Sequence, residues 1–364
     1  MPLRIGIIGM PNVGKSTLFN ALTHSRAAQA ANYPFCTIDP NVGVVEVPDS
    51  RLKKLADIVH PKKIIPATVE FVDIAGLVRG ASKGEGLGNQ FLAAIREVNA
   101  LCHVVRFFPG SEVIHVEGSI DPKRDRETVE TELALSDLST ITRRIEKTEG
   151  SARSGNKDAQ HELALLQKIE QALQGGKLAS TVAVPPEDLP LLHDFHLLSS
   201  KPMLYASNVA ETELKDFRSE ETRKLLGLSE GSEVVAISAK IEEDLQDLST
   251  EETSSFLAEL GVTSSGLDRL IASAYRILGY ITFFTAGPEE VRAWTTVRGA
   301  TAPEAAGVIH TDFQHGFIAA ETIAYEDYVT LGGEQKAKEA GKLKVEGKNY
   351  VVKDGDVMHF RFNV

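Results

Sequence analysis

Residues 9–16 place two glycines, a lysine and a serine at the spacing of a phosphate-binding loop. They read Gly-Met-Pro-Asn-Val-Gly-Lys-Ser, which fits the pattern G-x-x-x-x-G-K-S, between an apolar run at 3–8 and a helix-like run at 16–22. Loop amides at such a helix start point at phosphate oxygens, the lysine neutralises β- and γ-phosphate charge, and the serine hydroxyl binds Mg²⁺. The alternative is a glycine-rich turn that binds nothing. The sequence favours a nucleotide site whose loop residues are Asn12, Val13, Gly14, Lys15, Ser16 and Thr17.

A second magnesium ligand is expected where another buried strand ends. The apolar run 68–72 leads into Asp73-Ile74-Ala75-Gly76, a D-x-x-G motif. Asp73 is predicted to hold Mg²⁺ together with the hydroxyls of Ser16 and Thr37, and the Gly76 amide to reach the γ-phosphate. Thr37 alone could equally be an ordinary turn threonine. The glycine-rich stretch 76–90 is interpreted as a second mobile switch, with a plain surface loop as the alternative.

Two further strand ends are expected to meet the nucleotide base. Asn208, Val209 and Glu211 follow the apolar run 202–206, and a Ser-Ala-Lys triplet follows the run 233–237. In G-domain proteins these positions grip the base, usually through Asn-Lys-x-Asp, whose aspartate accepts two hydrogen bonds from guanine. Here valine stands at the lysine position and glutamate at the aspartate position. The predicted base-binding residues are Asn208, Val209, Glu211, Ser238, Ala239 and Lys240.

The order of apolar runs predicts an α/β protein. Strand-like and helical runs alternate, which favours a doubly wound, mostly parallel sheet. Two amphipathic stripes within 124–175, joined by a turn-rich stretch at 150–156, predict an antiparallel helical hairpin. We interpret it as a protruding docking arm; the alternative is an insert packed on the main domain. The predicted domains are a G domain at 1–122 and 200–278, a helical insert at 123–199 and a C-terminal domain of mixed sheet and helix at 279–364.

Bulk composition limits the classes of function. The 364 residues are 42% apolar and 25% charged, which is typical of a soluble globular protein. No apolar run reaches the ~18–20 residues of a membrane span, and no signal peptide is expected ahead of the first strand. Two cysteines make no disulfide framework, so a cytoplasmic location is expected. The net charge of −12 means that any nucleic-acid partner must meet a local basic patch.

Together these motifs resemble the YchF-type, Obg-related ATPases, a family of translation-factor-class P-loop NTPases. The resemblance rests on the phosphate loop and on Tyr-Pro-Phe-Cys-Thr-Ile-Asp-Pro, Asp-Ile-Ala-Gly-Leu-Val, Gly-Ala-Ser-Lys-Gly-Glu-Gly-Leu-Gly-Asn and Asn-Val-Ala-Glu. Residues 306–318 resemble a TGS domain, a ubiquitin-like β-grasp module. The resemblance spans essentially the whole chain. It implies a ribosome-associated NTPase, docked on the large subunit, that binds ATP at least as well as GTP.

The predicted preference for ATP has a physical reason. Glu211 is one methylene longer than aspartate, so its carboxylate cannot reach the guanine edge without backbone movement. Losing a guanine-specific pair of hydrogen bonds costs roughly 1–3 kcal/mol, about 10–100-fold in preference. We expect Asn208 or nearby main-chain groups to recognise adenine, with Val209 packing on the ring, while GTP and GDP still bind measurably. An Obg-like GTPase is the alternative.

The sequence offers several candidate residues for hydrolysis. Leu77 follows D-x-x-G, where many GTPases place a glutamine that orients water. Turnover is therefore expected to be slow and partner-stimulated, with Lys15 and Gly76 stabilising the transferred phosphate. His115 is a candidate base, although a histidine in an apolar run is more often structural. In related NTPases an asparagine at the position of Asn12 helps to seat K⁺, so K⁺ is expected beside Mg²⁺.

Two hypotheses of another class compete with an ATPase. Leu77 would also suit a nucleotide-gated scaffold that binds the ribosome with negligible turnover. Residues 333–364 carry seven Lys or Arg against five Asp or Glu, a net charge of +2, which would suit an RNA-binding module. The sequence therefore indicates RNA contact through the C-terminal domain and the helical insert, and no membrane partner.

Overall fold

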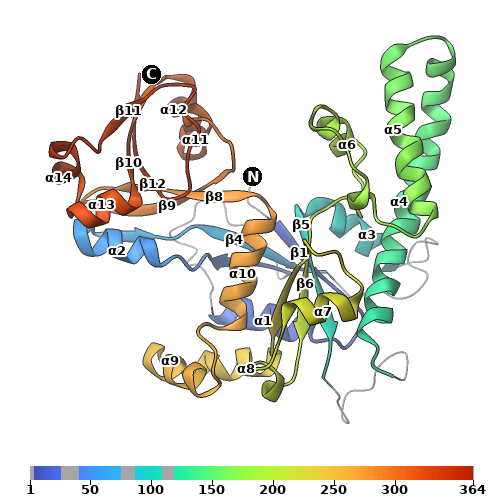
Figure 1. Ribbon diagram of the computed structural model, residues 1–364, viewed down its shortest axis with the longest axis horizontal. Helices are drawn as coiled ribbons and strands as arrows, with labels where there is room; N and C mark the ends of the chain where they lie inside the picture. The colour runs from blue at the N-terminus through green and yellow to red at the C-terminus, as the bar shows by residue number, and fades with distance from the viewer. Residues whose placement is uncertain (1–3, 26–40, 75–86, 109–118, 364) are drawn as a thin grey trace. The chain divides into compact units, whose positions relative to one another are not determined.

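The computed structural model describes residues 4–25, 41–74, 87–108 and 119–363, and Figure 1 shows the elements that they form. The chain divides into two compact units. Of the described residues, the first holds 4–25, 41–43 and those between 70 and 270, and the second holds 44–69 and 271–363. The boundary falls inside β2 (Val42–Glu46), β4 (Thr68–Asp73) and α10 (Gly266–Ile277).

A six-stranded sheet forms the centre of the first unit. Its order is β2-β4-β1-β5-β6-β7, and the pairs β1–β4, β1–β5, β5–β6 and β6–β7 are parallel. All seven residues of β5 are buried, as a central strand covered on both faces requires. The predicted doubly wound, mostly parallel sheet is confirmed. Its strands and helices outside the hairpin are β1 Arg4–Ile8, α1 Lys15–Ser25, α3 Leu87–Glu97, β5 Ala100–Arg106, β6 Met203–Asn208, α7 Ser219–Leu226, β7 Glu233–Ile237, α8 Ala239–Asp244 and α9 Thr250–Glu259.

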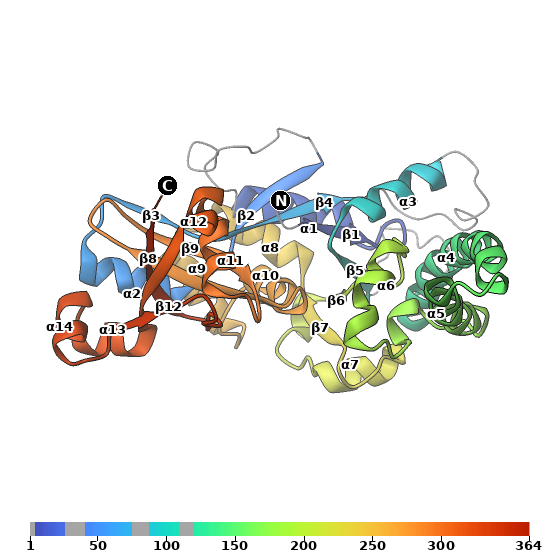
Figure 2. The ribbon, with the colours of Figure 1, turned by 90° about the horizontal axis from the view of Figure 1, so that it is seen from above.

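The predicted helical hairpin is α4 (Pro122–Arg153) followed by α5 (Lys157–Gln174). Asp121 caps α4 by accepting from the Arg124 amide, and Asn156 caps α5 by accepting from the Ala159 amide. The root of α4 contacts β5 and α7. The outer ends extend away from the sheet in Figure 1, and Figure 2 views the two helices nearly along their axes. The insert therefore packs on the main domain at its root and protrudes at its tip, and docking by the tip stays a prediction.

The outer hairpin has its own apolar core. Residues of α4 and α5 pack there against the segment that carries α6 (Leu189–Asp194). Asp137 of α4 ties this segment down, because its carboxylate accepts from the Leu198 and Ser199 amides and from the Ser199 hydroxyl. The core residues are Ala134, Ile141, Leu165, Leu166, Ile169, Leu173, Ala179, Phe195 and Leu197.

The second unit is built on another six-stranded sheet, in the order β11-β10-β12-β8-β9-β3. Strands β8 and β12 are parallel neighbours, β8 and β9 form an antiparallel pair, and α11 follows that pair and packs on the sheet. Within residues 280–363, the first strand, β8, and the last, β12, are neighbours inside the sheet, as expected for the β-grasp module that the sequence resembles. Its elements are α2 Ser50–Val59, β3 Lys63–Ile65, β8 Tyr280–Ala286, β9 Glu290–Val297, α11 Ala302–Ile309, α12 Thr311–His315, β10 Phe317–Ala324, α13 Tyr325–Leu331, α14 Glu334–Glu339, β11 Lys344–Glu346 and β12 Asp356–Phe362.

Residues 44–69 lie in the second unit, although the sequence placed them in a G domain running from 1 to 122. Strand β3 pairs in parallel with β9, from Lys63 opposite Glu290 to Ile65 opposite Arg292. In α2, Arg51 donates to both carboxylate oxygens of Asp354, at 2.8 and 3.3 Å. This segment completes the C-terminal sheet, so the unit is larger than the predicted 279–364.

The described ranges show neither a membrane-spanning helix nor a preformed cluster of metal ligands. Within them, no helix combines the length and the apolar character needed to cross a bilayer. The same ranges contain no cluster of three or more His, Cys, Asp or Glu side chains arranged to hold a metal ion. Cys102 is a free, buried thiol.

Candidate nucleotide-binding site

The phosphate loop connects β1 to α1, as the sequence predicts. Gly14 occupies the loop with φ of +99°, and a Cβ built there would lie 2.4 Å from Asn208 Nδ2. Only glycine fits both constraints. Asn12 has φ of +62°, a left-handed conformation that asparagine tolerates better than most residues, and it is exposed. Its backbone therefore turns sharply just before the amides expected to face the phosphates.

Lys15 begins α1 and lies back across the loop. Its Nζ donates to the carbonyl oxygen of Met10 at 2.7 Å, and the residue is 7% exposed. Burial lowers the pKa of Lys15 to about 8, partly offset by the charge of Asp73. The ammonium group is therefore still protonated at neutral pH, when its charge is needed.

Ser16 and Asp73 come together as predicted for a magnesium shell. The Ser16 hydroxyl donates to Asp73 Oδ2 at 3.3 Å. The other oxygen, Asp73 Oδ1, is buried without a hydrogen-bond partner among the described residues. An unpartnered buried carboxylate oxygen beside a serine hydroxyl suits Mg²⁺, which takes one or two protein oxygens and completes its shell with phosphates and water. The residues present thus fit the ion.

Asn208, the last residue of β6, connects the phosphate loop to the Ser-Ala-Lys segment. Its Nδ2 donates to the carbonyl oxygen of Val13 at 2.9 Å, and its Oδ1 accepts from the Ala239 amide at 3.2 Å. Asn208 is 2% exposed, so both bonds are shielded from water. Ser238 is buried at the start of α8, while Lys240 is exposed. The asparagine thereby fixes the phosphate loop relative to the Ser-Ala-Lys segment.

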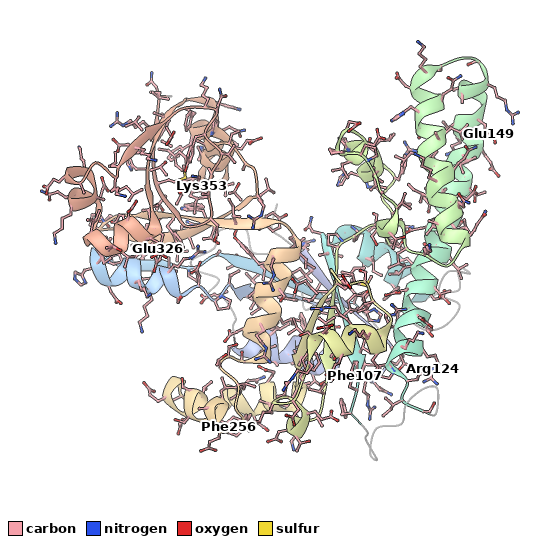
Figure 3. All side chains as sticks on the ribbon, viewed as in Figure 1. Phe107, Arg124, Glu149, Phe256, Glu326 and Lys353 are labelled. Carbon is pink, nitrogen blue, oxygen red and sulfur yellow. The ribbon has the colours of Figure 1, made fainter. Side chains whose placement is uncertain are left out.

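Val209 and Glu211 have opposite environments. Val209 is 5% exposed and packs in an apolar cluster with Leu214, Ala236 and Ile241. Glu211 begins a short 3₁₀ turn, Glu211–Glu213, and is exposed. Beside Val209 lies a pocket of about 350 Å³. Phe107, which follows β5 and is marked in Figure 3, lines this pocket together with Phe217, Thr222 and Leu225.

Three predicted site residues lie outside the described ranges. They are Thr37, Gly76 and His115. Their placement in the site stays a prediction. The predicted mobile switch at 76–90 stays one only for 76–86, because residues 87–90 form the first turn of α3.

Sequence reasoning missed two residues at the end of β5. Arg106 is fully buried, and its Nη1 donates to the carbonyl oxygen of Asn12 at 3.4 Å. Phe107 lines the pocket beside Val209. The available signal was an arginine at the end of a mostly apolar strand, immediately before two aromatic residues.

His103 lies in the same strand as Arg106, deeper in the sheet. It is 1% exposed, and burial, followed by the charges of Arg126 and Lys15, lowers its pKa to about 3. Tyr205, its partner across β5 and β6, donates to Glu130 Oε1 of α4 at 2.7 Å. The imidazole is therefore neutral at physiological pH.

The site belongs to a P-loop NTPase of the G-domain class. This class is defined by the phosphate loop on a parallel sheet, by the pair Ser16 and Asp73, and by Asn208, which connects the loop to the Ser-Ala-Lys segment. A family model described as a 50S ribosome-binding GTPase matches residues 4–147. The model of the YchF GTPase C-terminal domain, described as a protein of unknown function, matches residues 280–363. Full-length similarity then decides the family, and the chain belongs to the YchF family.

Full-length relatives occur among both curated proteins and solved structures. The ribosome-binding ATPase YchF of Bacillus subtilis (strain 168) is 53% identical, with 100% of each chain covered. The protein of the same name from Escherichia coli O157:H7 is 51% identical, again with 100% of each chain covered. The structure of the Schizosaccharomyces pombe YchF GTPase is 37% identical, with a TM-score of 0.89 over 99% of this chain and 97% of that one.

Proposed function

We propose that this protein is a magnesium-dependent, ribosome-binding ATPase that hydrolyses ATP to ADP and phosphate as a nucleotide-dependent switch. ATP is proposed rather than GTP because Val209 stands where a guanine-binding motif has lysine, and it is buried in an apolar cluster. The names of the curated YchF relatives support both the ATPase activity and the ribosome as partner.

The phosphate end of ATP would be held by the loop and its ions. Lys15 carries the positive charge, loop amides from Asn12 to Thr17 face the phosphates, and Mg²⁺ would be held by Ser16, Asp73 and Thr37. Bound there, Mg²⁺ neutralises charge on the β- and γ-phosphates. The contact of 3.3 Å between the Ser16 hydroxyl and Asp73 Oδ2 supports this assignment for two of the three residues.

The base would bind in the pocket beside Val209. Phe107 and Val209 offer apolar surface to a purine ring, and the pocket of about 350 Å³ is large enough for one. Adenine hydrogen bonds would come from the Asn208 region and from the segment Ser238, Ala239 and Lys240. Glu211 is exposed at the end of this region. We therefore expect its carboxylate neither to select guanine nor to prevent GTP from binding.

Restoring the guanine motif tests this choice. The double variant Val209→Lys with Glu211→Asp would read Asn-Lys-Ala-Asp at 208–211. We expect the ATP-to-GTP affinity ratio, measured by competitive titration, to fall about 10–100-fold because the aspartate regains two guanine hydrogen bonds. Glu230→Asp, the same acidic shortening at an exposed position outside this pocket, is the matched control. A wild-type protein that strongly prefers GTP would defeat the proposal.

Hydrolysis is expected to be slow until the ribosome stimulates it. His115 is proposed as the base that accepts a proton from water, since Leu77 cannot orient it. His115→Ala with unchanged turnover would remove this role.

K⁺ is proposed beside Asn12, and equal rates of hydrolysis in K⁺ and Na⁺ would count against it. Single-turnover assays with and without ribosomes separate the enzyme from a nucleotide-gated scaffold, which would show negligible turnover in both.

Ribosome docking is proposed for the tip of the α4–α5 arm and for the second unit, of which we assign residues 279–364 as a TGS domain. Figure 3 marks Glu149 at the outer end of the arm, where Lys147 and Arg153 are also exposed. We expect Lys147→Glu with Arg153→Glu to weaken sedimentation with large subunits and to reduce its salt dependence. The same double change leaving both unaltered would exclude RNA contact by the arm. This activity belongs in the cytoplasm, where the proposed partner is found.

A further inference from the structure

Arg106 occupies a position between the phosphate loop and Asn208. It is the last residue of β5, which lies between β1 and β6 in the sheet. Strand β1 leads directly into the phosphate loop, and β6 ends at Asn208, which is the register partner of Arg106. Arg106 is fully buried, with 0% of its surface exposed. Its side chain is therefore held inside the site rather than on its rim.

The guanidinium group of Arg106 contacts two backbone segments. Its Nη1 donates to the carbonyl oxygen of Asn12 at 3.4 Å, and its Nε donates to the carbonyl oxygen of Phe108 at 3.2 Å. The guanidinium carbon lies 4.4 Å from the centre of the Phe108 ring. A planar guanidinium can make two bonds and a stacking contact at once, which an ammonium group cannot. The side chain thereby ties the loop to the end of β5.

Arg106 and Asn208 hold consecutive carbonyl groups of the loop. Arg106 binds the carbonyl of Asn12, and Asn208 binds the carbonyl of Val13. In a planar trans peptide the C=O and the following N–H point in opposite directions. A carbonyl held toward the protein therefore turns the next amide away from it. By this rule Arg106 orients the Val13 amide and Asn208 orients the Gly14 amide, both toward the space expected to hold phosphate.

We propose that Arg106 is a positioning residue that aims the Val13 amide at the nucleotide phosphates. This inference rests on the proposed function only in requiring that the loop binds a nucleoside di- or triphosphate. It does not depend on which base is bound or on hydrolysis. The effect of losing Arg106 should therefore be shared by every nucleotide that carries the phosphates.

The test compares Arg106→Met and Arg106→Lys with the wild-type protein. Affinities for ADP, ATP and GDP are measured by titration calorimetry, and the Val13 amide is followed by ¹⁵N–¹H NMR during ADP binding. We expect Arg106→Met to weaken all three nucleotides by about 10–100-fold, with the adenine-to-guanine ratio unchanged. Arg106→Lys should recover only part of this loss. The shift of the Val13 amide on ADP binding should shrink in both variants.

Arg126→Met is the matched control. Arg126 is also buried, at 8% exposed, but it donates to the carbonyl oxygen of Gly227 and to Glu127, away from the loop. It should lower the unfolding midpoint while leaving ADP affinity within about threefold of wild type. A folded Arg106→Met that binds ADP as tightly as wild type, or keeps the full Val13 shift, would overturn the inference. A wild-type preference for guanine would instead defeat only the ATPase proposal.

Discussion

The protonation of Lys15 should make nucleotide affinity depend on pH. Its pKa lies at about 8 because burial destabilises the ammonium form, and Asp73 restores only part of the loss. Bound phosphates would add negative charge beside it and raise this pKa. Binding above pH 8 must then take up a proton, so affinity should fall as pH rises past the pKa of the free protein.

We expect ADP affinity to decrease between pH 7.5 and 9.5, approaching tenfold per pH unit at the upper end. Calorimetry in buffers of different ionisation enthalpy would report the proton uptake directly. Lys15→Arg is the control, because a guanidinium stays charged throughout this range. The ADP affinity of this variant should not change with pH over this range, and an equally steep fall would show that another group titrates.

Gly14 is a position in the site where adding a single methyl group should strongly weaken nucleotide binding. Its added Cβ would meet Asn208 Nδ2 at 2.4 Å, and its φ of +99° is strained for any other residue. We expect Gly14→Ala to weaken ADP binding by about 100-fold or more, since breaking the Asn208 bonds costs about 2–3 kcal/mol. Gly150→Ala, in α4 with no atom within 4 Å of its added Cβ, should leave binding unchanged.

At the scale of elements, the α4–α5 arm depends on one buried carboxylate. Asp137 accepts two amides and a hydroxyl from residues 198 and 199, and it is 2% exposed. Burial is the main cause that raises the pKa of Asp137, and the three hydrogen bonds oppose it. The segment that follows α6 is therefore fastened to the arm by charge-assisted bonds.

Asp137→Asn should destabilise this attachment by about 2–3 kcal/mol, because the new amide group faces backbone donors instead of accepting from them. Urea unfolding would measure the loss, and hydrogen exchange at residues 197–199 should speed up. Glu146→Gln makes the same acid-to-amide change at an exposed position of α4 and should cost under 0.5 kcal/mol. Equal costs for both variants would contradict this account.

At the scale of the whole molecule, two buried groups of the first unit make the free energy of unfolding depend on pH in opposite directions. His103 has its pKa lowered from 6.5 to about 3, so its contribution to stability is lost as pH falls below 6.5. Glu242 has its pKa raised from 4.5 to about 7, mainly by burial, while its Oε1 accepts from the Gly266 amide at 2.6 Å. Its contribution is lost as pH rises from 4.5 toward 7. Between pH 4.5 and 6.5 the two slopes oppose each other.

Glu242→Gln should therefore expose the slope of the histidine. We expect the unfolding free energy of this variant to rise with pH between 4.5 and 6.5 by up to about 1.4 kcal/mol per unit more than that of wild type. Denaturant titrations at several pH values would measure it. Glu243→Gln, an exposed neighbour, should retain the wild-type profile. A Glu242→Gln profile parallel to wild type would show that Glu242 keeps its ordinary pKa.

The parts of this molecule that sequence predicted are those governed by local patterns. The phosphate loop, the central strands and the helical hairpin each have a continuous signature, and Asp73 and Asn208 follow from the strand ends that carry them. The placement of 44–69 could not be predicted, because β3 is only three residues long and pairs with β9 more than 200 residues away. Arg106 was missed because its partners are carbonyl groups, which leave no trace in residue type.

The membership of 44–69 in the second unit bears on how the chain can be cut into fragments. A fragment that starts at residue 271 would lack β3 and so leave the edge of β9 open to pairing with other chains. It would also lack Arg51, whose guanidinium lies 5.2 Å from the centre of the Phe284 ring. An isolated C-terminal domain is thus an incomplete sheet, and a soluble version would need residues 44–69 grafted back onto it.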